Sequence, residues 1–117
     1  MADYWFDEDG VLHGVSKAAP RTVDTVKRNF DLVHSITHNR PVCVIMDVTD
    51  TKPYSLRAIK HLLAEFRYAY KAIAFVARSP IGLTVATLAK QFNPPNGAPL
   101  EVFDNSEEAR EWIRQYN

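Results

Sequence analysis

The sequence is poor in cysteine and glycine, and each shortage excludes a class of protein. The 117 residues include one cysteine, Cys43, so no disulfide can form within a chain and a reducing compartment is expected. Glycine occurs only four times, and no Gly-rich loop of the kind that holds nucleotide phosphates is present. No apolar stretch approaches the ~20 residues of a membrane-spanning helix, and the acidic N-terminus does not resemble a signal peptide. We therefore expect a cytoplasmic protein without a cofactor.

The composition is that of an ordinary globular protein, with 46% hydrophobic and 24% charged residues. The length suits one domain covering residues 1–117. The formal net charge is zero, but the charge is unevenly placed. Residues 52–90 contain seven basic residues and one acid, Glu65, a net charge of +6, and the rest of the chain carries −6. This separation predicts attraction of an anionic ligand or pairing of two copies as a homodimer, and ordinary solvated helix faces are the alternative.

The first part of the chain is predicted to form a β-hairpin followed by a helix. Residues 4–8 and 11–16 have the pattern of two strands, and Asp9-Gly10 between them is a strong hairpin signal. A break at 18–21 follows. Apolar residues then recur at helical spacing up to an expected helix end near His38-Asn39, before Pro41. These residues are Val23, Val26, Phe30, Val33 and Thr37, with Leu32 and Ile36 widening the stripe.

The remainder alternates strands with helices. Residues 42–48 and 72–77 are apolar runs typical of strands buried on both faces, and 100–103 is a shorter last strand. Between them lie a helical stripe, an apolar helix over 81–92 and a closing helix capped at Asn105. The stripe consists of Leu56, Ile59, Leu63, Phe66 and Tyr70, and the closing helix turns Ala109, Trp112, Ile113 and Tyr116 inward. The predicted fold is α/β: a mostly parallel sheet with an N-terminal hairpin and about four helices.

The candidate site lies where the two central strands end. Ser55 and Ser79 have the pattern of helix N-caps, each shortly after a buried strand, with Lys52 and Arg78 beside them. Free N–H groups at two helix N-termini on one sheet edge predict an anion cradle. The alternative is that both serines are only caps, each contributing ~1 kcal/mol.

Asp47 and Asp50 raise two enzyme hypotheses. A haloacid-dehalogenase-type phosphatase needs two acids two residues apart after a strand, but these are three apart and the chain is too short. A response-regulator receiver needs paired acids after its first strand and a lysine after its last, and neither is present. The alternative is that both aspartates accept hydrogen bonds from loop N–H groups.

Two further patterns predict weaker possibilities. His34 and His38 lie four residues apart on a helix, which is metal-ligand spacing, but no third ligand is evident and we expect no metal. Tyr68, between Arg67 and Lys71, is the exposed aromatic that a nucleic-acid surface would need, but a pI near 6.9 argues against nucleic acid.

The order of elements resembles the SpoIIAA-like STAS fold, and more narrowly the small bacterial STAS/SEC14-like domains of uncharacterised function. The segments that carry the resemblance are VIMDVTDTKPYSLRAIKHLL (44–63), AIAFVARSPIG (72–82) and VFDNSEEAREWI (102–113). The resemblance implies a non-enzymatic regulatory or binding module. It also implies a phosphorylated serine at the start of the helix after the central strand, which matches Ser55, with Thr51 the nearest other hydroxyl. The classical acceptor lies in a double-serine motif, whereas Tyr54 precedes Ser55 here.

The leading prediction is a STAS-type module that binds a protein partner through the loops after the central strands. The first alternative is a binding protein for a small anionic or lipid-like molecule, and the second is a receiver-like or small hydrolytic enzyme that uses Asp47. The predicted site consists of Asp47, Asp50, Thr51, Lys52, Tyr54, Ser55, Arg78 and Ser79.

Overall fold

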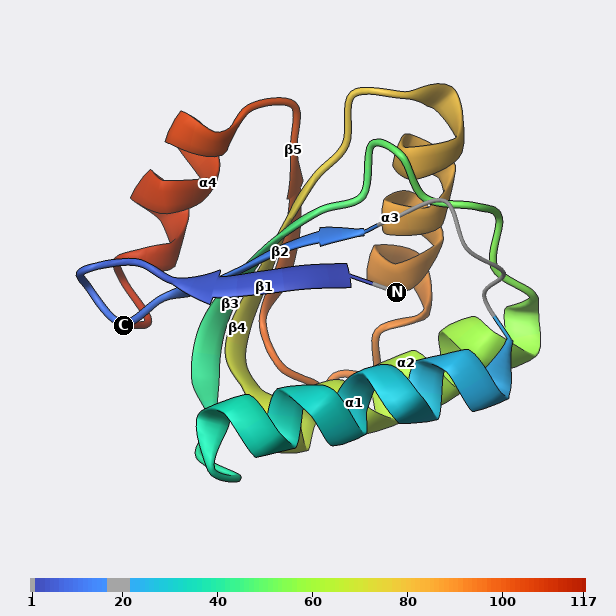
Figure 1. Ribbon diagram of the computed structural model, residues 1–117. Coiled ribbons are helices and arrows are strands. Elements are labelled where there is room, and N and C mark those ends of the chain that lie inside the picture. The colour runs from blue at the N-terminus through green and yellow to red at the C-terminus, as the bar shows by residue number, and fades with distance from the viewer. Residues whose placement is uncertain (1, 17–21) are drawn as a thin grey trace.

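The computed structural model describes residues 2–16 and 22–117 and contains one five-stranded sheet within them (Figure 1). The predicted break at 18–21 lies outside the described residues. The elements in chain order are β1 (Ala2–Phe6), β2 (Leu12–Ser16), α1 (Val23–Thr37), β3 (Val42–Asp47), α2 (Leu56–Ala69), β4 (Tyr70–Val76), α3 (Pro80–Phe92), β5 (Leu100–Phe103) and α4 (Ser106–Ile113).

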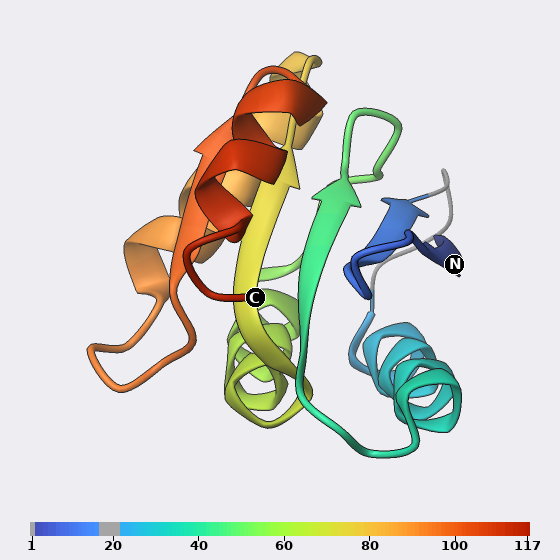
Figure 2. The same cartoon turned by 90° about the vertical axis from the view of Figure 1, so that its left-hand side faces the viewer.

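The strands lie side by side in the order in which they occur in the chain. β1 pairs with β2 antiparallel, and β2 to β5 are parallel to one another. A right-handed crossover between parallel neighbours always places its helix on the same face when every step goes in the same direction. α1, α2 and α3 accordingly pack on one face, and α4 lies on the other (Figures 1 and 2). The α/β fold with an antiparallel hairpin at one edge is confirmed.

The larger core lies between the sheet and α1, α2 and α3. Val26, Phe30 and Val33 of α1 are buried there, as the helical spacing predicts. Aromatic rings form its centre: Phe66 lies 5.5 Å from Tyr70, 5.9 Å from Phe30 and 6.1 Å from Phe75, measured between ring centroids. These distances are within the range in which aromatic pairs stabilise beyond simple burial.

The smaller core lies under α4. Ala109 and Ile113 of α4 pack on Cys43, Ile45, Ala72, Ala74 and Val76, with Trp112 and Tyr116 partly buried beside them. The small residues in β4 let α4 approach the sheet closely. The inward face predicted for the closing helix is confirmed, and burial raises the pKa of the Cys43 thiol.

Three side chains differ from their predicted positions. Leu56 and Leu32 were expected in buried stripes, but their exposed fractions are 50% and 40%. Leu56 is the first residue of α2, and helical side chains lean toward the N-terminus, so it projects past the start of the helix. Leu32 lies at the edge of the α1 stripe. Tyr70 is buried as expected, but it opens β4 and does not continue α2, because the strand begins directly after Ala69.

The hairpin loop is longer than Asp9-Gly10 alone predicts. Phe6 pairs with Leu12, so residues 7–11 form the connection. The Asp7 carboxylate accepts hydrogen bonds from the N–H groups of Asp9 at 2.9 Å and Val11 at 3.0 Å, which closes the wider loop. Gly10 takes a φ of 79°, the left-handed region that favours glycine.

Replacing Phe66 with alanine tests the aromatic centre of the larger core. We expect Phe66→Ala to lower the free energy of unfolding by about 3–5 kcal/mol, because it removes three ring contacts and leaves a cavity. Denaturant unfolding followed by circular dichroism measures this loss. Leu32→Ala on the exposed side of α1 is the matched control and should change it by less than about 0.5 kcal/mol. Equal losses in the two variants would contradict this account of the core.

Candidate functional site

Two loops are bound together at the carboxyl edge of β3 and β4. The Ser79 hydroxyl donates to the carbonyl of Thr49 at 2.6 Å, and the N–H of Arg78 donates to the Thr49 hydroxyl at 3.2 Å. Ser79 Oγ also accepts the N–H of Gly82 at 3.0 Å, as the cap of α3. The loop after β3 and the start of α3 therefore form one continuous surface.

Gly82 allows the first turn of α3 to lie directly on the loop after β3. A Cβ at this position would stand 2.5 Å from the carbonyl oxygen of Val48, closer than real Cβ atoms come to backbone. The backbone of α3 therefore packs directly against the loop, in the space that a side chain at position 82 would need. Together with the Thr49 and Ser79 hydrogen bonds, this contact fixes the relative position of the two loops.

The predicted anion cradle between two helix N-termini is wrong. Ser55 caps α2 by accepting the N–H of Ala58 at 3.1 Å, but α2 begins well away from the start of α3 (Figures 1 and 2). The loop from Val48 to Ser55 runs past α3 before α2 begins, which separates the two ends (Figure 1). Both serines are caps, and the Ser79 hydroxyl is already used as donor and acceptor within the fold.

Four of the eight predicted residues line two neighbouring hollows. One hollow, of about 810 Å³, is wide and lined by Asp50, Thr51 and Ser79 together with Val15, Ser16, Thr49, Pro80 and Ile81. The other, of about 210 Å³, contains Tyr54 and is described below. Asp47, Lys52, Ser55 and Arg78 line neither hollow, but Lys52, Ser55 and Arg78 adjoin lining residues in the sequence.

Asp47 and Thr51 are tied into the loop. Asp47 Oδ1 accepts the N–H of Thr49 at 2.9 Å, as the non-catalytic alternative predicts. Thr51 is buried, and its hydroxyl donates to the carbonyl of Lys52 at 3.2 Å. Asp50 is exposed. The strand order also differs from the 2-1-3-4-5 order of receiver domains. The receiver hypothesis is therefore excluded.

A small cavity lies deeper, between the sheet and the helices. Its volume is about 30 Å³, enough for one or two water molecules. The polar residues around it are Tyr4, Ser16, Asn29, Tyr54 and Tyr70. Burial raises the pKa of Tyr70 well above its usual value, and the neighbouring tyrosines raise it further. This cavity is too small for a lipid chain.

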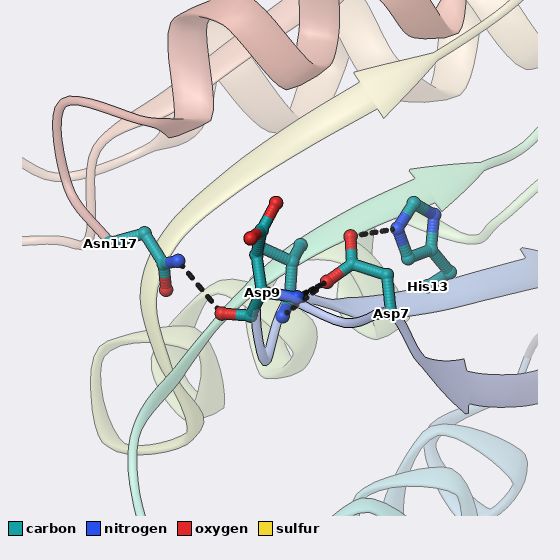
Figure 3. A network of polar contacts seen from close by, with 5 residues as sticks. Asp7, Asp9, His13 and Asn117 are labelled. Carbon is teal, nitrogen blue, oxygen red and sulfur yellow. Dashed lines mark hydrogen bonds and ion pairs between the residues drawn. The ribbon is translucent and has the colours of Figure 1, made fainter.

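The sequence patterns missed a polar network in the hairpin. His13 is buried on β2 with its Nε2 2.8 Å from Asp7 Oδ2, and the ring of Trp5 stacks on it at 5.4 Å. Figure 3 shows the Asp7 and His13 contact and the Asn117 side chain, which donates to the carbonyl of Asp9 at 3.0 Å. His13 had no evident partner in the sequence. The signal available in the sequence was Asp7, two residues before the Asp9-Gly10 turn, which could have been predicted to reach His13 on the opposite strand.

Neither a metal centre nor a membrane span is found in the described part of the chain. Among residues 2–16 and 22–117, no three His, Cys, Asp or Glu side chains are grouped so that they could hold a metal ion. His38 ends α1 in the left-handed conformation, and its backbone N–H donates to the carbonyl of His34. No helix within the same ranges has the length and apolar character needed to cross a membrane.

The chain has a SpoIIAA-like fold. It is similar to a solved structure of an uncharacterised protein of the DUF3478 family from Shewanella loihica PV-4, described as having a SpoIIAA-like fold. The two are 16% identical with a TM-score of 0.59, over 97% of this chain and 92% of the other. A likeness at this identity establishes the fold alone.

The family follows from the sequence itself. The model of the family described as "Domain of unknown function (DUF7793)" matches residues 4–117, so the chain belongs to that family. No curated protein matches the chain. The resemblance to the SpoIIAA-like fold is confirmed, and the function of the family is uncharacterised.

Replacing Ser79 tests whether its hydroxyl joins the two loops. We expect Ser79→Ala to lower the free energy of unfolding by about 1–2 kcal/mol, because it removes both a helix cap and the donor to Thr49. Ser55→Ala is the matched control, since it removes an exposed cap alone and should cost ~1 kcal/mol or less. Chemical denaturation of the two variants measures the difference, and a larger loss for Ser55→Ala would contradict this role.

The Asp7 carboxylate should make the hairpin sensitive to acid. Burial alone would raise its pKa, but hydrogen bonds from His13, Val11 and Asp9 outweigh burial and lower the pKa below its usual value of 3.8. A lowered pKa gives stability that is present above the unfolded value and lost as the pH falls through the folded value. Below pH ~4 the stability of wild type should therefore fall more steeply than that of Asp7→Asn.

Unfolding midpoints measured from pH 5 down to pH 2 check this expectation. Asp31→Asn, on the exposed side of α1 and away from its ends, is the control for the loss of a carboxylate. A slope for Asp7→Asn that equals the wild-type slope would show that the carboxylate is not held in its charged form.

Proposed function

We propose that the chain is a non-enzymatic regulatory or binding module that recognises a protein partner through the surface formed by loop 48–55 and the first turn of α3. The observation that supports this most directly is the Thr49 and Ser79 hydrogen bonding, which holds both loops in one arrangement. A surface fixed before binding loses little conformational entropy when a partner docks.

The shape of the surface favours a protein over a small molecule. Sites for small ligands bury most of the ligand in a cleft or cavity. The hollow beside Asp50 and Thr51 is wide and open, and the enclosed cavity below it holds only about 30 Å³. A helix or loop of a partner covers an open surface of this kind more completely than a metabolite or lipid does.

The hydroxyl groups at this edge also favour binding over catalysis. Ser79 Oγ is engaged on both sides by Thr49 and Gly82, so it is not available as a nucleophile. Asp47 holds the N–H of Thr49 through one carboxylate oxygen. Both groups stabilise the loop that a partner would contact.

Ser55 is the proposed switch. Its side chain is exposed at the start of α2, where a phosphate would meet free helix N–H groups and add a charge of about −1.5 to −2 between Lys52 and Arg57. We propose that this charge changes partner binding without disturbing the fold. Pairing of two copies through the basic and acidic segments stays a prediction.

Affinity capture from a lysate of the source organism tests the proposal. We expect immobilised wild type to retain a partner that Arg78→Glu loses, because this substitution reverses an exposed charge beside the first turn of α3. Ser55→Glu should retain that partner in a different amount. Asp31→Lys, an exposed charge reversal on α1, is the control and should retain as much partner as wild type.

Circular dichroism and native mass spectrometry complete the test. The former confirms that each variant is folded, and the latter detects any small molecule that copurifies. A partner retained equally by all variants would remove this surface from the account. A bound small molecule that is lost in Arg78→Glu would favour the ligand-binding alternative.

A further inference from the structure

The exposed surface of α3 is unusually apolar for a surface helix. Ile81 and Leu83 expose 47% and 50% of their side chains. The helix carries no charged residue before Lys90. Single exposed apolar side chains are normal on proteins, but these two occupy the first turn of α3, which belongs to the proposed binding surface.

A groove of about 210 Å³ lies between this helix and the loop after β3. Its walls are Pro53, Tyr54, Pro80, Ile81, Thr84 and Leu88, with Val85 buried at its base. The Thr84 hydroxyl donates to the carbonyl of Pro80 at 2.8 Å, so this polar group is satisfied within the helix. The groove therefore offers mainly apolar surface to an occupant.

The groove keeps its shape without an occupant. The Ser79 hydroxyl holds the Thr49 carbonyl, and the close approach of Gly82 to Val48 fixes the first turn of α3 against the loop. Both contacts lie beside Pro80 and Ile81, on the wall of the groove. An apolar side chain can enter without rearrangement of the backbone.

The surroundings of the groove are basic. From Thr51 to Lys90 the sequence contains one acid, Glu65, which lies near the far end of α2, and Asp50 lines the neighbouring hollow, not the groove. Lys52 adjoins Pro53, Arg78 lies two residues before Pro80, and Arg57 is on the first turn of α2; all three are exposed. None of them forms an ion pair within residues 2–16 and 22–117. An occupant with acidic groups beside its apolar ones fits this charge.

We infer that the groove receives an acidic amphipathic helix of a partner protein, with apolar side chains in the groove and carboxylates toward Lys52, Arg57 and Arg78. None of the lining residues lies in a strand of the sheet, so addition of an extended peptide to a sheet edge does not apply. An apolar groove with charged borders is the usual receptor for an amphipathic helix. The inference rests on the proposed function and names the partner of that surface.

The probe is a fluorescein-labelled synthetic helix of 18 residues with leucine on one face and glutamate on the other. Its control carries lysine at each glutamate position. The chain has no net charge, so only a local basic surface distinguishes the two peptides. We expect the acidic peptide to bind at least 10-fold more tightly than the basic one in fluorescence anisotropy, with a difference that shrinks as salt rises.

Variants of the groove locate the contact. Ile81→Ser should weaken binding of the acidic peptide about 10-fold or more, and Arg78→Glu should weaken it most at low salt. Leu32→Ser and Lys27→Glu on the exposed side of α1 are matched controls and should leave binding unchanged. Amide chemical-shift changes should cluster on Tyr54, Ile81, Thr84 and Leu88.

Three results would overturn the inference: equal binding of both peptides, shift changes away from the groove, or unaltered binding in Ile81→Ser. Ile81→Ser could instead leave peptide binding unchanged. If it then weakens binding to phosphatidylglycerol vesicles, the groove belongs to a membrane, and if it changes the sedimentation of the protein alone, the groove belongs to a second copy. If the peptide fails while Arg78→Glu still loses its partner from lysate, the binding surface stands and only the helical partner is wrong.

Discussion

The arrangement of this fold depends on one constraint, which is that every parallel crossover connects neighbouring strands in the same direction. Right-handed connections then place α1, α2 and α3 on one face of the sheet. The other face is left to α4, which packs on β3, β4 and β5. Trp5 on β1 faces the same side and stays half-exposed, because the covering helix lies over the opposite half of the sheet.

The same constraint shapes the candidate site. Open α/β sheets usually bind ligands where the strand order reverses and neighbouring loops part to opposite faces. Here the order does not reverse between β2 and β5, and the loops after β3 and β4 lead to helices on the same face. These loops meet and bond to each other through Thr49 and Ser79. No deep cleft opens between the two loops, and the hollows beside them are shallow. A surface of this shape suits a macromolecular partner.

The sequence was sufficient for most of the fold because its signals are local. Apolar periodicity located the helices, continuous apolar runs located the central strands, and Ser79-Pro80 correctly marked the start of α3. The predicted mostly parallel sheet with an N-terminal hairpin follows from the alternation of strands and helices. The resemblance to the SpoIIAA-like fold rested on the same order of elements.

Features that depend on three-dimensional paths were not predictable in this way. Helical spacing cannot show that Leu56 is exposed at the start of α2, or that α2 starts away from α3 after the loop from Val48 (Figure 1). The contact between Asp7 and His13 joins two strands across a turn whose length was misjudged. The close approach of Gly82 to Val48 joins segments that are more than 30 residues apart, and a single glycine in a helix gives no sign of it.

The lone thiol has a consequence for the motions of this protein. Cys43 is fully buried beneath Ala109 and Ile113, and its raised pKa keeps it protonated. A thiol reagent reaches it only when α4 lifts from the sheet or the whole chain unfolds. The rate of thiol modification therefore reports the rate or the equilibrium of α4 opening, and it needs no engineered label.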